Sequence, residues 1–238
     1  PTGGGPQIRD GLRLPLPIAP ERTLTERVAA YGTVTDDHAI EIPIKLPRDV
    51  LPGHGGVTID TSSTLLGGLE DAVHELVHYP YGCIEQTASG LLPIVALAPL
   101  ARDYPLGLPD PKAFATAGID RIISMQTPSG GFGYWPGATE VHVYASAYAT
   151  WVLQLAVKAG YPVPDDALRR ALDHLETRIN GIKLAQIPVD WGYHDGVRTA
   201  IALHALADAG RDVRKQSAEL YTLRQQLPQF ARAFLLLA

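Results

Sequence analysis

Helical segments that recur at a fixed spacing constrain the fold of this chain more than any other feature of its sequence. Two Ala- and Leu-rich segments, YASAYATWVLQLAVKAGYP and GVRTAIALHALADAGRD, both end in Ala-Gly, at Gly160 and Gly210. Aligned on these ends, they place Leu153 opposite Leu203, so the period is 50 residues. Helix pairs at a fixed period predict an α/α repeat whose inner helices pack into an arc or ring. An ordinary helical bundle is the alternative, since two copies alone do not exclude it.

Three further segments extend the helical pattern. An apolar stripe at helical spacing precedes Pro80, which ends that helix, and consists of Leu65, Leu66, Leu69, Ala72, Val73, Leu76 and Val77. Between the two repeats, DDALRRALDHLETRI predicts an amphipathic helix with Asp165 or Asp166 as its cap. The chain stops at FARAFLLLA, an apolar helix without a polar end, which predicts an array that continues past residue 238.

The first 62 residues have a different character, because they are rich in Pro and Gly and carry short β-branched runs. The segments AIEIPIKLP and GGVTIDTSST predict strands, and RVAAYGTV is a weaker candidate. Three strands without a closing partner do not make an independent β-domain. We therefore expect a β-rich segment over residues 1–62, followed by a mainly α domain over residues 63–238.

Composition excludes several classes of function. With 238 residues and 46% hydrophobic content, the chain can bury a core. Its net charge of −5, without long runs of one sign, gives no electrostatic footprint for nucleic acid or an anionic membrane surface. No apolar run is long enough to cross a bilayer, and PTGGGPQIRDG lacks the layout of a secretion signal. The single cysteine, Cys83, excludes an internal disulfide framework.

The stretch HELVHYPYGCIEQTASGLL, residues 74–92, contains two chemical patterns, and the first resembles a zinc site. In H-E-x-x-H, here His74, Glu75 and His78, two histidines on one helix face bind the metal and the glutamate activates a water molecule. Both histidines, however, project away from the apolar stripe. Tyr81 and Ile84 stand where the extended motif has Gly and a third His. We therefore expect a solvated helix face with no metal, and a zinc site would need a remote Glu ligand.

The second pattern is Cys83-Ile84-Glu85-Gln86, in which a cysteine precedes a glutamine by one helical turn. At this spacing the Cys83 thiolate can attack the Gln86 carboxamide, expel ammonia and leave a thioester. Gly82 gives the backbone freedom for a helix that starts at Cys83, where the helix dipole favours a thiolate. The alternative is a small buried cysteine beside a surface glutamine, which is the usual location of both residue types.

The longer segment YPYGCIEQTAS resembles the thioester segment of bacterial alpha-2-macroglobulins, members of the family that includes the complement thioester proteins. The preceding LLGGLEDAVHELVHYPYG is similar to the helix ahead of that segment, and MQTPSGGFGYWPG is similar to the Gln…Gly-Gly-aromatic-Trp segment of their thioester domain. PERTLTERVAAYG resembles the β-rich segment upstream. The resemblance implies an α/α toroid inserted into a β-sandwich (CUB/macroglobulin-like) domain, of which residues 1–62 would be a part.

The resemblance also implies a stoichiometric protease trap rather than an enzyme. Cys83 and Gln86 match the thioester-forming positions, and Glu85 matches the acid of the motif. Cleavage of a bait region elsewhere exposes the thioester, a lysine amine of the protease attacks the Gln86 carbonyl, and Cys83 leaves as a thiol. The implied partners are target proteases and the remaining domains of the parent chain. No cofactor is implied, and the implied location is the periplasm or the cell envelope.

A thioester persists only where water and stray amines are kept away. We expect aromatic cover from four side chains, with ordinary core packing as the alternative for each: Tyr79, Tyr81, Tyr134 and Trp135. Some complement relatives recruit a downstream histidine that redirects the thioester toward hydroxyl groups. His194 lies at a comparable distance along the chain and His142 is a second candidate, with a surface or helix-capping role as the alternative for both.

Other interpretations stay open beside the protease trap. The segment Gln126…Gly130-Gly131-Phe132 also resembles the Gln-to-aromatic repeat of terpenoid cyclases and prenyltransferases, although no Asp-x-Asp-Asp motif is present and Cys83 would have to bind zinc. A toroid that binds partners without forming a thioester is another alternative. The H-E-x-x-H metalloprotease is a third alternative, as weakly supported as the cyclase.

Overall fold

The computed structural model describes residues 82–97, 110–184 and 195–238, together with single residues before position 82. The chain divides into two compact units, Pro1–Ile59 and Asp60–Ala238. Of the predicted strands only isolated positions are described, so the strands and the proposed β-sandwich segment stay predictions. All described α-helices belong to the second unit.

The described part of the second unit is helical. Its elements are α2 (Ile84–Leu97), α3 (Pro111–Ile123), α4 (Val143–Lys158), α5 (Asp165–Asn180), α6 (Asp195–Asp208), α7 (Arg214–Tyr221), the 3-10 turn η3 (Arg224–Gln226) and α8 (Gln229–Leu237). Within residues 82–97, 110–184 and 195–238, the one β-pairing is an isolated antiparallel bridge between Gln126 and Phe132. The mainly α prediction is confirmed.

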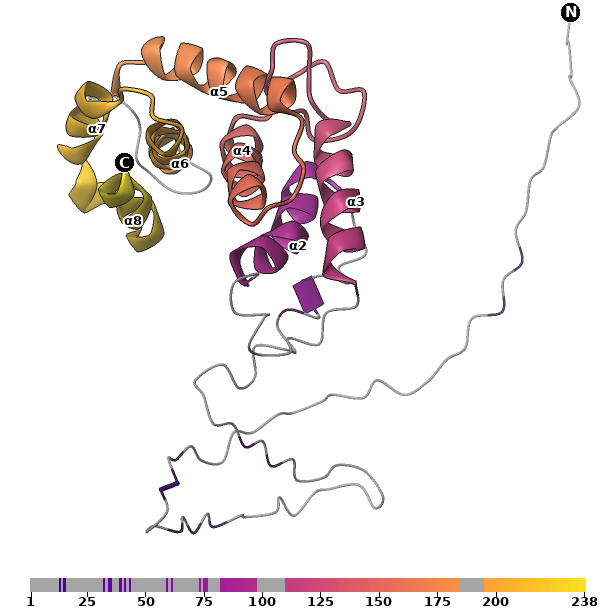
Figure 1. Ribbon diagram of the computed structural model, residues 1–238. Coiled ribbons are helices and arrows are strands. Elements are labelled where there is room, and N and C mark those ends of the chain that lie inside the picture. Colours follow the sequence, from indigo (N-terminus) through magenta and orange to yellow (C-terminus); the bar gives the residue numbers. More distant parts are fainter. Residues whose placement is uncertain are drawn as a thin grey trace, which may run out of the picture. The chain divides into compact units, whose positions relative to one another are not determined.

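The helices form two layers that alternate along the chain. Helices α2, α4, α6 and α8 contact one another in succession, and α3, α5 and α7 each contact the two helices that they connect. In Figure 1, α3, α5 and α7 accordingly lie outside the row formed by α2, α4, α6 and α8. This is the inner and outer arrangement of an α/α hairpin array, and it favours the toroid over an ordinary bundle.

The predicted 50-residue repeat is present in the inner layer. Helices α4 and α6 end alike, because Gly160 and Gly210 both adopt positive φ, of 86° and 75°. The side chain of Gln154 on α4 donates to the carbonyl of Ala205 on α6 at 2.9 Å. One turn further on, Lys158 pairs with Asp208, which lies 50 residues later. Positions 50 or 51 residues apart therefore face each other on the two helices, which run in the same direction.

The start of α5 differs from the sequence prediction. Its N-cap residue is Pro164, which offers no side-chain cap, so neither Asp165 nor Asp166 is the cap that we expected. Asp166 lies inside the first turn instead and accepts hydrogen bonds from Arg169 and Arg170. The bond from Arg169 is the main cause of a lowered pKa of the Asp166 carboxyl. The Pro164 carbonyl accepts from the Leu168 N–H at 3.1 Å, so the first turn closes on Pro164, one residue earlier than a cap at Asp165 would place it.

The core consists of two clusters of buried side chains that share neighbours. One is built mainly from α2, α3 and α4, and the other mainly from α5, α6, α7 and α8. Trp151 on α4 and Leu168 on α5 pack against both clusters. Of the apolar stripe predicted before Pro80, Val73 is buried as expected, but the prediction is wrong for Leu76, whose side chain is 44% exposed.

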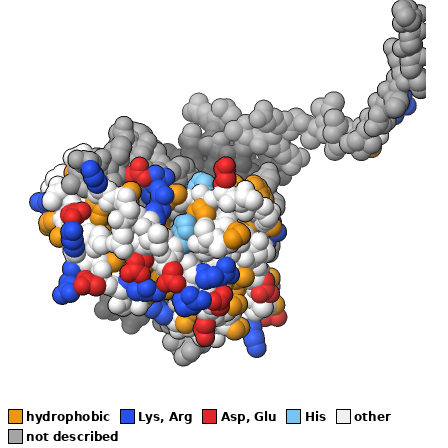
Figure 2. All heavy atoms as spheres, turned by 90° about the horizontal axis from the view of Figure 1, so that it is seen from above, with side chains coloured by type: hydrophobic (Ala, Val, Ile, Leu, Met, Phe, Trp, Pro, Cys, Tyr) orange, Lys and Arg blue, Asp and Glu red, His pale blue; other side chains and the backbone are white. Residues whose placement is uncertain are grey.

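The surface carries charges of both signs. On the face drawn in Figure 2, Lys and Arg side chains are interspersed with Asp and Glu, so no large patch of one sign forms there. Among the described residues, no helix has the length and apolar character required to cross a membrane.

Candidate functional site

Cys83 lies immediately before α2, as the sequence predicts, and closes the first turn of that helix. Its carbonyl accepts hydrogen bonds from the backbone N–H and the side-chain hydroxyl of Thr87, each at 2.9 Å. The cysteine is only 2% exposed, and Ile84 beside it is fully buried. The one cysteine of the chain is thus a buried residue at the N-terminus of an inner helix.

Gln86 turns its carboxamide back toward Cys83. The backbone N–H of Cys83 donates to Oε1 of Gln86 at 3.4 Å, a long hydrogen bond. A side chain at the third helical position that bonds the N-cap amide is the reciprocal half of a capping box. The same geometry brings the Gln86 carboxamide beside the residue that carries the thiol. The structure therefore brings the two predicted thioester residues together on one turn.

The peptide groups on both sides of Cys83 also have partners from elsewhere in the chain. The carbonyl of Gly82 accepts hydrogen bonds from Nη2 and Nε of Arg121, which lies in the last turn of α3, at 3.0 and 3.3 Å. The N–H of Ile84 donates to the carbonyl of Tyr134 at 3.2 Å. Sequence reasoning missed Arg121, because a side chain that bonds a main-chain carbonyl 39 residues away leaves no pattern in the sequence.

Glu85 and Ser89 lie one turn apart on α2, and both affect Tyr148 on α4. The hydroxyls of Ser89 and Tyr148 are 3.2 Å apart. Burial is the main cause of a raised pKa of Tyr148, the Ser89 hydrogen bond opposes it, and the negative charge of Glu85 raises it further. Glu85 thus lies near enough to Tyr148 for its charge to contribute to the raised pKa of that hydroxyl, a neighbourhood that the sequence did not suggest.

An exposed aromatic group lies beside this turn. Tyr134, whose carbonyl bonds Ile84, is 38% exposed, and Trp135 is 48% exposed. Their rings meet edge to face with centroids 6.0 Å apart. Core packing, the alternative that we considered for both, is therefore wrong. Tyr79 and Tyr81, the other two side chains expected to cover the site, lie outside the described residues.

His142 is the N-cap residue of α4, and Ala145 N–H donates to its Nδ1 at 3.3 Å. Its ring lies edge to face with that of Tyr134, with centroids 5.1 Å apart. The capping alternative is thus confirmed for His142, although the ring neighbours the segment that contacts α2. His194 lies outside the described residues.

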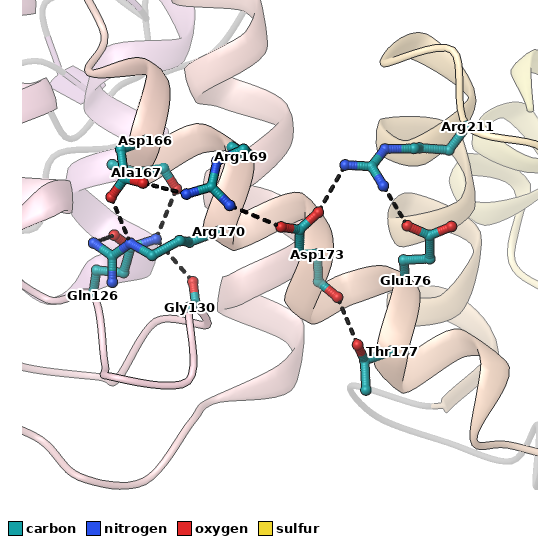
Figure 3. Close-up of polar contacts among 10 residues, drawn as sticks. All are labelled: Gln126, Gly130, Asp166, Ala167, Arg169, Arg170, Asp173, Glu176, Thr177 and Arg211. Carbon is teal, nitrogen blue, oxygen red and sulfur yellow. Dashed lines mark hydrogen bonds and ion pairs between the residues drawn. The ribbon is translucent and has the colours of Figure 1, made fainter.

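The segment that leads to Tyr134 is held at two points. Phe132 is fully buried, and its N–H donates to the buried hydroxyl of Ser146 at 2.8 Å. Six residues earlier, the Gln126 amide donates to the carbonyls of Gly130 and Ala167 at 2.9 and 2.8 Å, and its oxygen accepts from Arg170 at 2.6 Å. Figure 3 shows this contact between α5 and the turn. The Gln and aromatic positions of the predicted motif therefore have a structural function.

No metal centre is evident in the part of the chain that the structure describes. Within residues 82–97, 110–184 and 195–238, and at the single positions before them, no group of three His, Cys, Asp or Glu side chains could hold an ion. Glu75 is exposed, while His74 and His78 lie outside the described residues. The described residues therefore offer no third ligand that would support the zinc alternative.

Comparison with known proteins finds bacterial alpha-2-macroglobulins among both the sequence relatives and the solved structures. No protein-family model matches the chain. Alpha-2-macroglobulin of Escherichia coli strain K12 is 33% identical over 190 residues, which cover 76% of this chain and 11% of that protein. The structure of Salmonella alpha-2-macroglobulin reacted with methylamine is 29% identical, with a TM-score of 0.54, and the match covers 67% of this chain and 11% of that one. Trypsin-activated alpha-2-macroglobulin from Escherichia coli is 27% identical, with a TM-score of 0.50, over 67% and 12% of the two chains.

These sequence and structural matches point to the same group of proteins. The chain spans about one tenth of the length of these relatives. The chain is thus identified as a relative of the bacterial alpha-2-macroglobulins, matching a short segment of these much longer proteins.

Proposed function

We propose that Cys83 and Gln86 form an internal thioester and that this chain is the part of a protease trap that attaches covalently to its target. The observation that carries the proposal is the hydrogen bond from Cys83 N–H to Oε1 of Gln86, because it holds the carboxamide on the turn that bears the thiol. Burial of Cys83 supports the proposal further, because a thioester persists only where water is excluded.

Formation of the bond balances without an outside reagent. Sγ of Cys83 attacks Cδ of Gln86, a carbon–sulfur bond forms, and the carbon–nitrogen bond of the carboxamide breaks. Ammonia leaves with the thiol proton. Holding both groups on one helical turn makes this an intramolecular step, which avoids most of the entropic cost of bringing two reactants together.

The second step consumes the thioester once per molecule. An amine attacks Cδ of Gln86, an amide forms, and Cys83 leaves as a thiol with one proton from the amine. The Salmonella relative is described as reacted with methylamine, which supports an amine as the nucleophile. A lysine of a target protease would be the physiological amine, and the trypsin-activated Escherichia coli relative supports proteases as targets. The chain would act as a stoichiometric inhibitor in the periplasm or cell envelope.

The cover over the bond belongs to the same proposal. Tyr134 and Trp135 are exposed beside the turn and would limit the access of water together with Tyr79 and Tyr81. Because Tyr134 and Trp135 keep much of their surface exposed, a further surface from the parent protein would complete the cover.

Intact mass spectrometry tests the proposal directly. The chain with a thioester is lighter by one ammonia than its sequence predicts, and it does not react with thiol reagents. Methylamine then adds one molecule per chain and exposes one thiol. A Cys83→Ser chain is the matched control, since it keeps the size of the side chain and should show the full mass and no uptake.

Two other outcomes would favour the alternatives. A chain of full mass whose Cys83 titrates freely would show a binding module without the thioester. Stoichiometric bound zinc, together with proteolytic turnover that is lost in Glu75→Ala, would support the metalloprotease interpretation. Either result would contradict the proposed trapping chemistry in this chain.

A further inference from the structure

All four main-chain polar groups nearest to Cys83 have defined partners. The carbonyl of Cys83 accepts from Thr87, and its N–H donates to Gln86. The N–H of the next residue donates to the Tyr134 carbonyl, and the carbonyl of the preceding residue accepts from Arg121. Main-chain atoms that are paired on both sides of a residue fix the direction in which its side chain points.

Arg121 differs from the other distant partner in a way that makes it testable. Tyr134 contributes a main-chain carbonyl, which no substitution removes, whereas Arg121 contributes its guanidinium. Two nitrogens of this planar group bond one carbonyl, at 3.0 and 3.3 Å, so the group fixes an orientation as well as a distance. A lysine carries its three N–H donors on a single nitrogen, so it could not supply this fork.

The helix that carries Arg121 is anchored in the core. Ala115, Ile119 and Ile122 of α3 are buried in the cluster that also contains residues of α2, while Arg121 itself is exposed. At Gly82, a β-carbon would lie 3.4 Å from Nη2 of Arg121, which is ordinary van der Waals contact. The guanidinium therefore lies directly against the backbone that enters the reactive turn.

We propose that Arg121 is a positioning residue for the thioester, which it serves by holding the Gly82–Cys83 peptide in the orientation that keeps Sγ of Cys83 directed at Cδ of Gln86. The inference depends on the proposed function. Without this contact the turn samples other orientations, so closure slows. A thioester that has already formed is then hydrolysed faster, because the more mobile turn admits water to Cδ. In this hydrolysis water attacks Cδ, a glutamate is left at position 86, and the Cys83 thiol is released.

The effect on folding should be small by comparison. Arg121 is exposed, and hydrogen bonds from an exposed side chain contribute little to the free energy of unfolding. Misplacement of a reacting group by about 1 Å, in contrast, can change a rate by about 100-fold. Loss of the Arg121 side chain should therefore change the rates of thioester formation and hydrolysis while it leaves the free energy of unfolding almost unchanged.

The experiment compares Arg121→Gln and Arg121→Lys with the wild-type chain, and uses Arg214→Gln as the matched control. The Arg214 side chain is 89% exposed and pairs with Asp212, away from the reactive turn. For each chain, intact mass gives the fraction that lacks one ammonia, and thiol titration gives the rate of decay in buffer and of methylamine uptake. Thermal unfolding of each chain is measured in parallel.

We expect Arg121→Gln to lower the thioester fraction and to speed its decay by about tenfold or more, at an unfolding temperature close to that of the wild type. Arg121→Lys should be intermediate, and Arg214→Gln should match the wild type. Equal thioester fractions and decay rates in Arg121→Gln and the wild type would overturn this inference alone. A large fall in unfolding temperature in both Arg121 variants would overturn it in favour of a folding role. Absence of the mass deficit in the wild type would overturn the proposed function as well.

Discussion

His174 on α5 is a half-buried titratable side chain, and its surroundings give the fold a dependence on pH. Its Nδ1 lies 3.1 Å from the carbonyl of Ser129, so this nitrogen carries the proton in the neutral ring. Gly131 is close enough that a β-carbon there would lie 2.8 Å from Nε2. Burial lowers the pKa of His174, with a smaller contribution from the positive charge of Arg178, and the Ser129 hydrogen bond opposes both.

The sign of the pH effect follows from that direction. A folded-state pKa below the unfolded value, about 6.5, means that protons bind the unfolded chain more tightly. The contribution of His174 to the free energy of unfolding is thus fully present above about pH 6.5, and is lost as the pH falls through the folded-state pKa. We expect His174→Gln to lose less stability than the wild type between about pH 7 and pH 5, measured by urea unfolding. Parallel pH profiles of the two chains would contradict this assignment.

At the scale of an element, the turn between α3 and α4 needs glycine at two positions for different reasons, backbone conformation alone at Gly137 and a close contact as well at Gly130. Gly130 and Gly137 both have positive φ, of 91° and 78°. A β-carbon at Gly130 would lie 2.3 Å from the carbonyl oxygen of Arg170, whereas at Gly137 it would meet nothing within 4 Å. Figure 3 shows Gly130 bonded to Gln126, beside Arg170.

Alanine substitutions at the two glycines therefore distinguish the cost of a strained backbone from the cost of a steric clash. We expect Gly137→Ala to cost about 1 kcal/mol, since an L-residue rarely adopts positive φ. Gly130→Ala should cost about 3 kcal/mol or more, because backbone atoms of α5 and of the turn must move apart. Chemical denaturation of both variants measures the difference. Equal losses would show that the contact with α5 is not tight.

The helices could be predicted from sequence to a large extent, because the apolar periodicity and the residues that start and end a helix are local signals. The 3.6-residue pattern and the Ala-Gly ends located α4 and α6, and Gly82 indicated a helix that starts near Cys83. The contacts that complete the site could not be predicted. Arg121 and Ser146 act on main-chain atoms far along the chain, and such contacts do not depend on which side chain the partner carries.

At the scale of the whole molecule, Trp151 connects the two core clusters. Its ring lies edge to face with Phe234 on α8, with centroids 4.9 Å apart, and 6.0 Å from the ring of Tyr148 on the same helix. It also approaches His204 on α6, at 6.4 Å. One side chain therefore contacts the inner helices on both sides of the boundary between the clusters.

Trp151→Ala should consequently weaken the coupling between the clusters as well as the total stability. We expect a loss of about 2–4 kcal/mol and a denaturant transition that broadens or splits in two, followed by circular dichroism. Trp135→Ala is the matched control, since Trp135 lies outside both clusters and is 48% exposed, and it should cost less than about 0.5 kcal/mol. A single transition of unchanged slope in Trp151→Ala would show that other contacts couple the clusters.

The register between α4 and α6 limits how a chain of this kind can change in length. Because Lys158 faces Asp208 and Gln154 faces Ala205, these contacts fix how the side chains of α4 and α6 align, which is a fixed frame within each helix rather than a fixed number of residues between them. One residue inserted within α6 would turn the rest of the helix by about 100° and carry its buried side chains away from α4. The same residue inserted in the turn at 161–164 would leave that frame intact. Insertions and deletions among descendants of such a chain should therefore gather in the turns, or occur as whole repeats.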